Sequence, residues 1–364
     1  AFLCVGLAQL LAREGMGLDV VSAGELAVAQ AAEFPRERVH LHGNCKSPEE
    51  LQRALDWGIG TIVVDGWHAL DRLREQTAGR GERQRVWLRV APGIDVHTHA
   101  HRKTGLLDSK FGFTLETGEA AAALRQALAT PGLEVVGLHA HVGSQVFEPE
   151  PFACAAAALL DLAAAEGYAP LELSPGGGWG SATDPDATDL PLRVYGEAVV
   201  AAVRERCGLH GLPLPRITVE LGRAIVGPAG VAVYTVGGRK EVPGVRTYVA
   251  LNGGMGDNIR PALYGARYAA LAVYAAAGRP WETVTLAGRY CESGDVLARD
   301  LRLPRLAAGD LIAIPRAGAY ALPMASNYNL VPRPAVVLVG EGRARLLQRR
   351  ETVEDLLRRD VPLA

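Results

Sequence analysis

Short apolar runs alternate with segments of helical periodicity over the first 228 residues. Runs such as Arg38–His42 and Thr61–Asp65 read as buried strands, and Pro48–Trp57 reads as a helix. Ser47 precedes that helix as an N-cap, and Glu50 completes a capping box. Roughly seven strand-then-helix units with short connections follow in this way, and such alternation is typical of a parallel sheet covered by helices.

The number of units predicts a barrel. A closed (β/α)₈ barrel needs about one unit more than the chain shows. Ala1 reads as the end of a strand that runs directly into a helix at Leu7–Glu14. We therefore expect a (β/α)₈ TIM barrel over residues 1–228, with a first strand that is missing from the printed chain.

The pattern changes after residue 228. Apolar, β-rich runs at Gly230–Val236, Thr247–Leu251, Thr283–Leu286, Asp310–Ile314 and Ala335–Val339 are separated by Gly and Pro. Helical periodicity returns only at Val353–Arg359. These runs predict a second, β-rich domain over residues 229–364.

Composition narrows the function classes. The chain has 364 residues, a net charge of −2 and 49% hydrophobic residues, so it can bury a large core and has no basic field for nucleic acid. The most apolar helix-like stretch, Phe152–Ala165, is interrupted by Asp161 and is too short to span a bilayer. Five scattered cysteines without zinc-ligand spacing predict no metal site and a reducing cytoplasm.

Polar residues gather where the predicted strands end, which is where barrel enzymes place their chemistry. These positions are Asp19, His42–Asn44, Asp65, Arg89, His139–Gln145, Gly176–Gly178 and Glu220–Arg223. We therefore predict an active site at this end of the barrel.

The glycine triplet Gly176–Gly178 is a weak signal when it is taken alone. A glycine-rich turn after a strand can leave its backbone N–H groups bare for a phosphate, although many such loops are only tight turns. His141 precedes a small polar turn at Gly143-Ser144, but a lone histidine is also common in a core. Glu220 is open to two interpretations: an ion pair with Arg223, or a buried carboxylate that holds a protonated ring nitrogen.

Taken together, these motifs resemble the fold-type III pyridoxal phosphate-dependent decarboxylases, an alanine racemase-like family. The motifs, in chain order, are His141–Gln145, Gly176–Gly178, Glu220–Arg223, Arg260–Gly265, Cys291–Asp295 and Gly318–Tyr320. Within that family, Thr98–Gly105, Ser109–Gly112 and Met324–Asn329 are most similar to the diaminopimelate decarboxylases. The resemblance covers essentially the whole chain.

The resemblance implies pyridoxal 5′-phosphate as cofactor and assigns residues to it. His141 matches the histidine that stacks on the pyridine ring, and Glu220 matches the carboxylate at the ring nitrogen. The remaining cofactor-binding positions are Ser144, Gly176, Gly177 and Gly178 for the phosphate, with Gly222, Arg223, Tyr320, Asp19 and Arg89 as further contacts. Glu25 matches a position near the Schiff base.

The resemblance also implies a substrate site and a dimer. The substrate-binding positions are Arg223, Arg260, Tyr264, Glu292 and Tyr320, where Glu292 receives a distal ammonium. Cys291 resembles the residue that returns a proton to the substrate carbon, although a cysteine in a β-domain is often a small core residue. In the family Cys291 and Glu292 enter from the neighbouring subunit, which implies a homodimer with shared active sites. Arg260 precedes Pro261, where a loop is expected.

The implied reaction converts meso-2,6-diaminopimelate to L-lysine and CO₂, the last step of lysine biosynthesis. Two alternatives remain: a related decarboxylase acting on ornithine, arginine or a carrier-bound amino acid, and a non-catalytic paralogue that binds the cofactor.

The family's catalytic lysine does not match any lysine of the chain. Lys46, Lys103, Lys110 and Lys240 all lie away from the end of the first barrel strand. The motif spacing around Ala1-Phe2 places the Schiff-base lysine immediately before Ala1. Either that lysine exists and carries the cofactor covalently, or the chain is truncated and inactive; we expect the first.

Overall fold

The computed structural model describes residues 1–94, 109–274 and 278–363. The Thr98–Gly105 motif and Lys103 therefore lie outside the described residues. Two compact units are present. One contains Val5–Gly180 and Leu190–Leu221, and the other contains Ala1–Cys4, Ser181–Asp189 and Gly222–Ala364. We call them the sheet-and-helix unit and the β-rich unit; a domain boundary at 228–229 remains a prediction.

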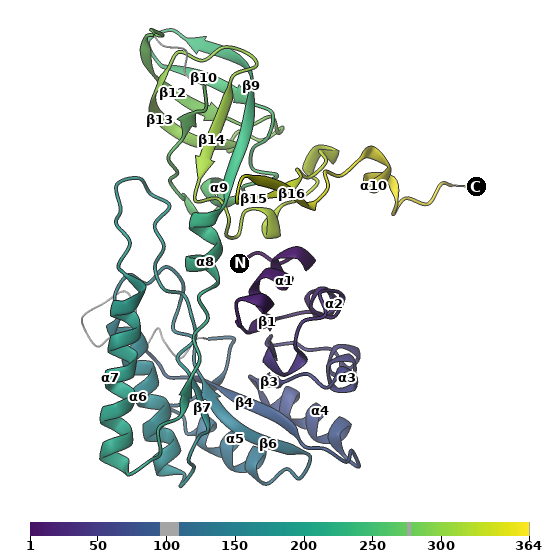
Figure 1. The fold of residues 1–364 in the computed structure, drawn as a ribbon, viewed down its shortest axis with the longest axis vertical. Helices are drawn as coiled ribbons and strands as arrows, with labels where there is room; N and C mark the ends of the chain where they lie inside the picture. The colour runs from purple at the N-terminus through teal and green to yellow at the C-terminus, as the bar shows by residue number, and fades with distance from the viewer. Residues whose placement is uncertain (95–108, 275–277, 364) are drawn as a thin grey trace. The chain divides into compact units, whose positions relative to one another are not determined.

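The sheet-and-helix unit is built on parallel strands with helices along the outside (Figure 1). Its strands are β1 (Leu18–Val20), β2 (Val39–Leu41), β3 (Thr61–Val64), β4 (Gln84–Ala91), β5 (Phe113–Thr114), β6 (Leu133–His139), β7 (Glu172–Ser174) and β8 (Arg216–Ile217). Its helices are α1 (Val5–Arg13), α2 (Ala23–Ala31), α3 (Pro48–Trp57), α4 (Trp67–Thr77), α5 (Glu119–Leu128), α6 (Glu150–Ala165) and α7 (Leu192–His210). The order β1-β2-β3-β4-β6-β7-β8 follows the chain, and β5 pairs with β4.

The α3 helix begins as its sequence predicts. The Ser47 side chain accepts a hydrogen bond from the Glu50 N–H, and the Glu50 carboxylate accepts one from the Ser47 N–H. The helix ends at Gly58, whose φ of +71° suits a left-handed C-cap. Its buried face carries Leu51, Ala54 and Leu55.

Strand register separates an apolar face of the sheet from a polar one. Leu88, Leu138 and Leu173 form one register row and are fully buried. On the rows at either side, Trp87, Gly137 and Glu172 are in register, and so are Arg89, His139 and Ser174. Successive side chains alternate between faces, so the second face carries polar groups along its length.

Trp87 organises that polar face. A Cβ on Gly137 would come within 2.9 Å of the Trp87 indole, so the absence of a side chain there makes room for the ring. The indole N–H donates to Glu172 Oε2 at 2.8 Å. Arg85 and Arg216 bind the other oxygen, so this buried carboxylate is fully partnered.

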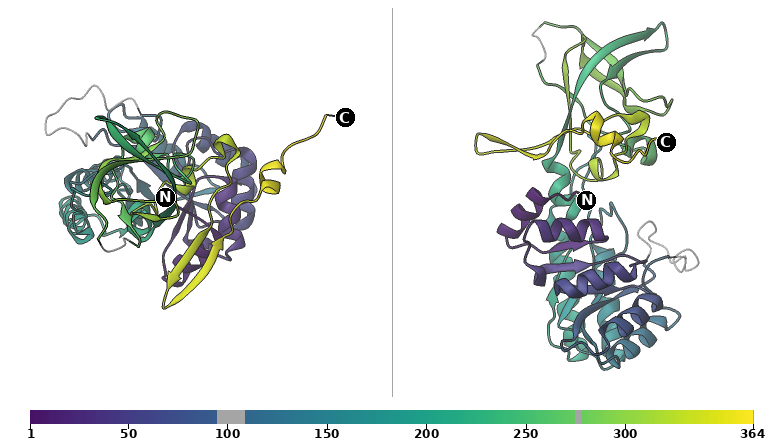
Figure 2. Two further views of the ribbon diagram at one scale, coloured as in Figure 1. Left: turned by 90° about the horizontal axis from the view of Figure 1, so that it is seen from above. Right: turned by 90° about the vertical axis from the view of Figure 1, so that its right-hand side faces the viewer.

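The β-rich unit holds a six-stranded sheet and a separate hairpin (Figure 2). Its strands are β9 (Val231–Val242), β10 (Arg246–Leu251), β11 (Leu271–Ala272), β12 (Trp281–Ala287), β13 (Val296–Pro304), β14 (Leu311–Pro315), β15 (Val336–Gly340) and β16 (Arg343–Gln348). Its helices are α8 (Gly222–Ala229), α9 (Arg260–Tyr264) and α10 (Val353–Leu357). Its core contains Tyr234, Val249, Tyr268, Leu286 and Ile312.

These observations confirm the predicted fold class, a (β/α) barrel-type domain with a β-rich second domain. Among the described helices, none is long and apolar enough to cross a membrane.

Candidate functional site

The glycine triplet follows β7 and packs against the backbone of neighbouring strand ends. Gly176 and Gly178 have φ values of +81° and +95°, a region that favours glycine. A Cβ on Gly177 would overlap the carbonyl oxygen of Glu220, and one on Gly178 would overlap that of Gly143, beside Ser144. Only glycine permits this close approach.

Two amides of the triplet already have partners. The Gly176 N–H donates to Ser174 Oγ at 3.2 Å, and the Gly177 N–H donates to His141 Nδ1 at 3.3 Å. The prediction that the turn leaves its N–H groups bare is therefore wrong for these two residues. Gly176–Gly178 instead form a closely packed backbone segment that is hydrogen-bonded to His141, and we call this segment the glycine wall.

His141 lies just beyond β6 as a neutral imidazole. Its Nδ1 accepts the Gly177 amide, so its proton belongs on Nε2. Burial is the main cause that lowers the pKa of His141. About a third of the side chain stays exposed, which leaves a flat, uncharged ring face available for stacking.

Glu220 follows β8 and forms a parallel bridge with Gly177. Its Oε1 lies 2.6 Å from His139 Nε2, and its Oε2 lies 3.8 Å from His141 Nδ1. Burial acts to raise the pKa of Glu220, but His139 and His42 hold that pKa below its usual range. The carboxylate is therefore ionised at neutral pH, as a partner for a protonated ring nitrogen must be.

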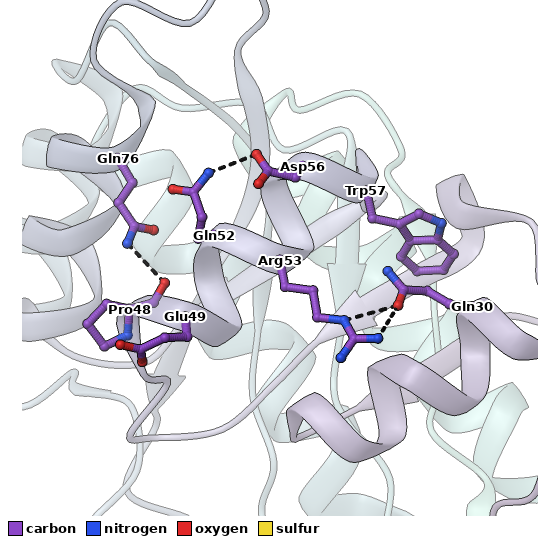
Figure 3. Close-up of a pocket in the computed structure, with 8 residues that line it drawn as sticks. All are labelled: Gln30, Pro48, Glu49, Gln52, Arg53, Asp56, Trp57 and Gln76. Atoms are coloured by element: carbon purple, nitrogen blue, oxygen red, sulfur yellow. Dashed lines mark hydrogen bonds between the residues drawn. The ribbon is translucent and has the colours of Figure 1, made fainter.

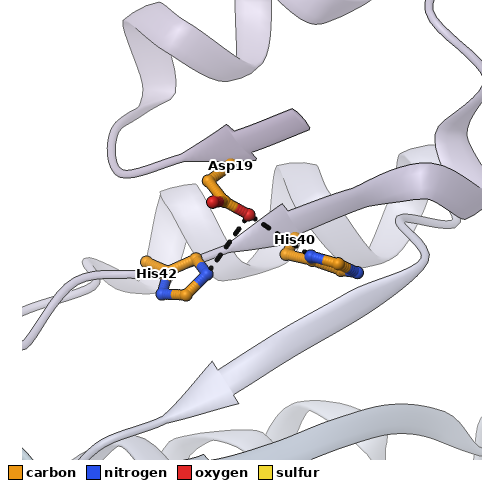
Figure 4. Close-up of side chains that lie close together, drawn as sticks. All are labelled: Asp19, His40 and His42. Carbon is orange, nitrogen blue, oxygen red and sulfur yellow. Dashed lines mark hydrogen bonds and ion pairs between the residues drawn. The ribbon is translucent and has the colours of Figure 1, made fainter. Parts of the chain in front are cut away.

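The Asp19 carboxylate contacts two histidines, His40 and His42 (Figure 4). The sequence did not predict this three-residue contact. Its Oδ1 lies 3.3 Å from His40 Nδ1 and 3.4 Å from His42 Nε2. Partial desolvation acts to raise the pKa of Asp19, whose side chain is 37% exposed, but His42 and His40 hold that pKa far below its usual value. For His42, burial acts to lower the pKa, yet Asp19 and Glu220 raise it.

This cluster has the spacing of metal ligands. The ligand atoms of Asp19, His40 and His42 lie within 4.8 Å of one another, as do those of His42, His139 and Glu220. Carboxylate–imidazole pairing accounts for that spacing without an ion. The pairing of these histidines could have been predicted from the sequence, because residues 40 and 42 are two positions apart in an extended segment and therefore point to the same face.

Arg89 and Glu25, two further predicted residues, and the lysine Lys46 each have defined contacts. Arg89 places its guanidinium carbon 4.5 Å from the centre of the Phe111 ring, within the Ser109–Gly112 motif. Glu25 accepts the Val21 N–H at 2.8 Å and so fixes the backbone just after β1. Lys46 Nζ donates to Val63 O at 2.6 Å and lies 3.5 Å from Asp65 Oδ1. Lys46 is thus a buried lysine whose ammonium group already has partners.

The β-rich unit contains the predicted arginines. Arg223 stands in α8, opened by Gly222, with its guanidinium carbon 4.5 Å from the Tyr320 ring centre. Burial lowers the pKa of Arg223, and the nearby positive charge of Arg260 lowers it further. Two guanidiniums held together in this way suit an anionic ligand.

Arg260 corrects a prediction about its own surroundings. A loop is expected there, but Arg260 begins helix α9 and is 6% exposed. Pro261 is tolerated because the first helical turn needs no intrahelical N–H bond. The Arg260 Nε–H donates to the Tyr268 hydroxyl at 3.1 Å, and its guanidinium lies 5.4 Å from the exposed Tyr264 ring.

Cys291 and Glu292 lie exposed on a braced loop of the same unit. The buried Asp295 carboxylate accepts the Met255 N–H at 2.6 Å and the Tyr290 N–H at 2.8 Å. Asn329 Oδ1 accepts the Cys291 N–H at 3.0 Å. The exposure of Cys291 argues against the interpretation that it is a core residue.

A groove of about 740 Å³ lies elsewhere, on the outer helices α2, α3 and α4 (Figure 3). Gln52 donates to Asp56 at 2.8 Å along α3, and Arg53 donates to Gln30 at 3.0 Å. These side chains satisfy one another and lie on helices, away from the strand ends. We assign the chemistry to the strand ends rather than to this groove.

The strand-end residues fit a phosphorylated pyridine. The glycine wall permits close backbone approach, His141 offers a neutral ring face, and Glu220 offers an ionised carboxylate. His139 Nδ1 is a buried polar atom without a hydrogen-bond partner among the described residues.

Known proteins are similar in sequence to this chain over essentially its whole length. Residues 1–227 match the family described as pyridoxal-dependent decarboxylase, pyridoxal binding domain. A diaminopimelate decarboxylase of Bacillus subtilis (strain 168) is 45% identical over 366 residues, covering 100% of this chain and 83% of the relative. One of Actinosynnema pretiosum is 46% identical, covering 98% of this chain and 81% of the relative.

Solved structures share its fold. A diaminopimelate decarboxylase of M. jannaschii in complex with L-lysine aligns with a TM-score of 0.92 at 33% identity, covering 98% of this chain and 82% of that one. The Helicobacter pylori enzyme complexed with L-lysine aligns with a TM-score of 0.87 at 31% identity, covering 97% and 86%.

The buried His139 makes stability depend on pH. Burial lowers the pKa of His139 from 6.5 to about 4, so the unfolded chain binds a proton there before the folded protein does. Stability therefore falls as pH drops below 6.5, by about 2 kcal/mol between pH 7 and pH 5. We expect His139→Leu to flatten the dependence of the unfolding free energy on pH by that amount in urea titrations. His210→Leu, at a 2.7 Å pair with Asp161, is the control; equal pH dependence in all three proteins would refute the assignment.

Proposed function

Because the chain belongs to the diaminopimelate decarboxylase family of pyridoxal-dependent decarboxylases, we propose that it converts meso-2,6-diaminopimelate to L-lysine and CO₂. The observation that carries this substrate is 45% identity to a diaminopimelate decarboxylase over the entire chain. The paired guanidiniums Arg223 and Arg260 support it, because the substrate retains a second carboxylate after the first has left.

The residues at the strand ends would hold pyridoxal phosphate. Gly176–Gly178 and Ser144 bind its phosphate, His141 packs on the face of its ring, and Glu220 Oε2 keeps a proton on the ring nitrogen. Asp19 and Arg89 lie around this group. When bound, the cofactor supplies an electron sink for the electron pair that remains as CO₂ departs.

Residues of the β-rich unit act on the substrate. Arg223 and Arg260 bind the remaining carboxylate, with Tyr264 and Tyr320 beside them, and Glu292 binds the distal ammonium. The carbon–carboxylate bond breaks, CO₂ leaves, and the Cys291 thiol delivers a proton to the same carbon. One proton is consumed for each CO₂ released, so the Cys291 thiol must regain a proton from solvent before the next turnover.

Carbon dioxide release tests the proposed substrate. Full-length protein with pyridoxal phosphate should decarboxylate meso-diaminopimelate with a kcat/KM about 100-fold or more above that for ornithine or arginine, because both of these lack the second carboxylate and would leave the paired guanidiniums without an anionic partner. Preference for ornithine, arginine or a carrier-bound amino acid would identify a related decarboxylase. A bound cofactor absorbance without any turnover would identify a non-catalytic paralogue.

We further propose a homodimer in which Cys291 and Glu292 serve the partner's cofactor. Both side chains are exposed on a loop that Asp295 and Asn329 hold rigid, as a loop that completes another subunit's site must be. Cys291→Ala and Glu220→Gln should each abolish activity alone.

Co-expression of these two variants tests the sharing. Half of randomly assembled dimers are mixed, and each mixed dimer regenerates one intact site, so activity should recover to about a quarter of wild type. No recovery, with mixed dimers demonstrated by differential tags, would show that Cys291 serves its own subunit.

We place the protein in the cytoplasm, since all five cysteines are unpaired thiols. Cell fractionation that finds it in an oxidising compartment would contradict this.

A further inference from the structure

The two oxygens of Glu220 have different surroundings. Oε1 faces the inner histidines, at 2.6 Å from His139 Nε2 and 4.0 Å from His42 Nε2. Oε2 lies on the side of His141, whose Nδ1 is 3.8 Å away, too far for a hydrogen bond. Oε1 is therefore fixed by a histidine, while Oε2 keeps lone pairs that can accept a hydrogen bond from a ligand.

His139 is a neutral donor. Its side chain is 1% exposed, and its Nδ1 has no hydrogen-bond partner among the described residues. An imidazole with one partnered nitrogen places its proton where the acceptor is, so Nε2–H donates to Glu220 Oε1. Burial, which lowers the pKa of His139 to about 4, keeps the ring uncharged at neutral pH.

The His139 ring is fixed by its neighbours. Trp87 lies nearly parallel to it, with ring centres 6.2 Å apart and an interplanar angle of 12°. His42 meets it edge-on at 5.1 Å and 71°. Trp87 is itself anchored on Glu172, so the donor direction of His139 is set by packing rather than by its bond to Glu220.

The other basic side chains near Glu220 are His42 and Arg89, and each has another partner. His42 Nε2 lies closer to Asp19 Oδ1, at 3.4 Å, than to Glu220 Oε1, at 4.0 Å. Arg89 also acts on Glu220 electrostatically, but its guanidinium lies over Phe111. The only hydrogen bond to Glu220 Oε1 that we find in the described part of the chain comes from the uncharged His139.

We infer that His139 is a positioning residue for Glu220: its neutral N–H orients the carboxylate without neutralising it, so that the second oxygen can pair with the protonated ring nitrogen of pyridoxal phosphate. This inference rests on the proposed role of Glu220. A lysine or arginine in the same place would orient the carboxylate equally well, but it would neutralise the charge that the pyridinium nitrogen requires.

Two substitutions separate the hydrogen bond from the packing. His139→Leu fills the space without a donor, whereas His139→Gln returns an N–H near the original Nε2 position. His210→Leu removes a surface imidazole from Asp161 and serves as the matched control.

Cofactor affinity and spectrum are the readouts. In full-length protein, His139→Leu should weaken pyridoxal phosphate binding about 10- to 100-fold, the effect of losing one hydrogen bond to a charged group. It should also shift the pH dependence of the bound cofactor's visible absorption band and lower kcat more than it changes KM. His139→Gln should recover at least half of the lost binding free energy, and His210→Leu should match wild type.

Two results would overturn the inference. Wild-type binding and spectrum in His139→Leu would show that Glu220 needs no orienting donor. Equal losses in the Leu and Gln variants, with unfolding midpoints of both near wild type, would show that only the ring shape matters. Failure of the proposed function is distinct, because wild-type protein would then release no CO₂ from diaminopimelate.

Discussion

A single, largely desolvated carboxylate, Glu220, constrains the arrangement of the strand ends around it. A charge removed from water must be compensated, and here the compensation comes from His42, just after β2, and from His139 at the end of β6. The backbone of the same residue touches Gly177, which forces that position to be glycine. The carboxylate, the glycine wall and His141 are thus positioned as one block.

The polar block depends on a second buried charge deeper in the sheet. Glu172 holds the Trp87 indole, and the indole packs against His139, which in turn binds Glu220. Gly137 makes room for the indole between the two histidine-bearing strands. A chain of contacts therefore connects a structural ion pair to the group at the centre of the proposed chemistry. Rigidity of this kind is what a preorganised electrostatic site requires.

Elements with strong local signals could be predicted, and those stabilised by neighbours could not. The α3 helix carries its own cap and was predicted with the observed bounds. Strand β13 was missed because Arg299, Asp300 and Arg302 interrupt its apolar pattern; pairing with β12 supplies the stability that its sequence lacks. Helix α8 was missed because Gly227 and Pro228, which lie within it, are poor helix formers.

The sequence by itself determined the alternation of strands and helices, the glycine triplet, and the ring of polar residues at the strand ends, because these depend on local propensity and on where parallel strands stop. It also carried the motifs that identify the family. Only the tertiary structure decided how those residues pair: Glu220 with His139, Asp19 with His40 and His42, and Arg260 with Tyr268. The partners are separated by 21 residues for Asp19 and His40, and by 81 for His139 and Glu220. The protonation states of these groups depend on burial and on the charges beside them. Neither contact nor burial is encoded in a local pattern, so both emerge only when the chain is folded.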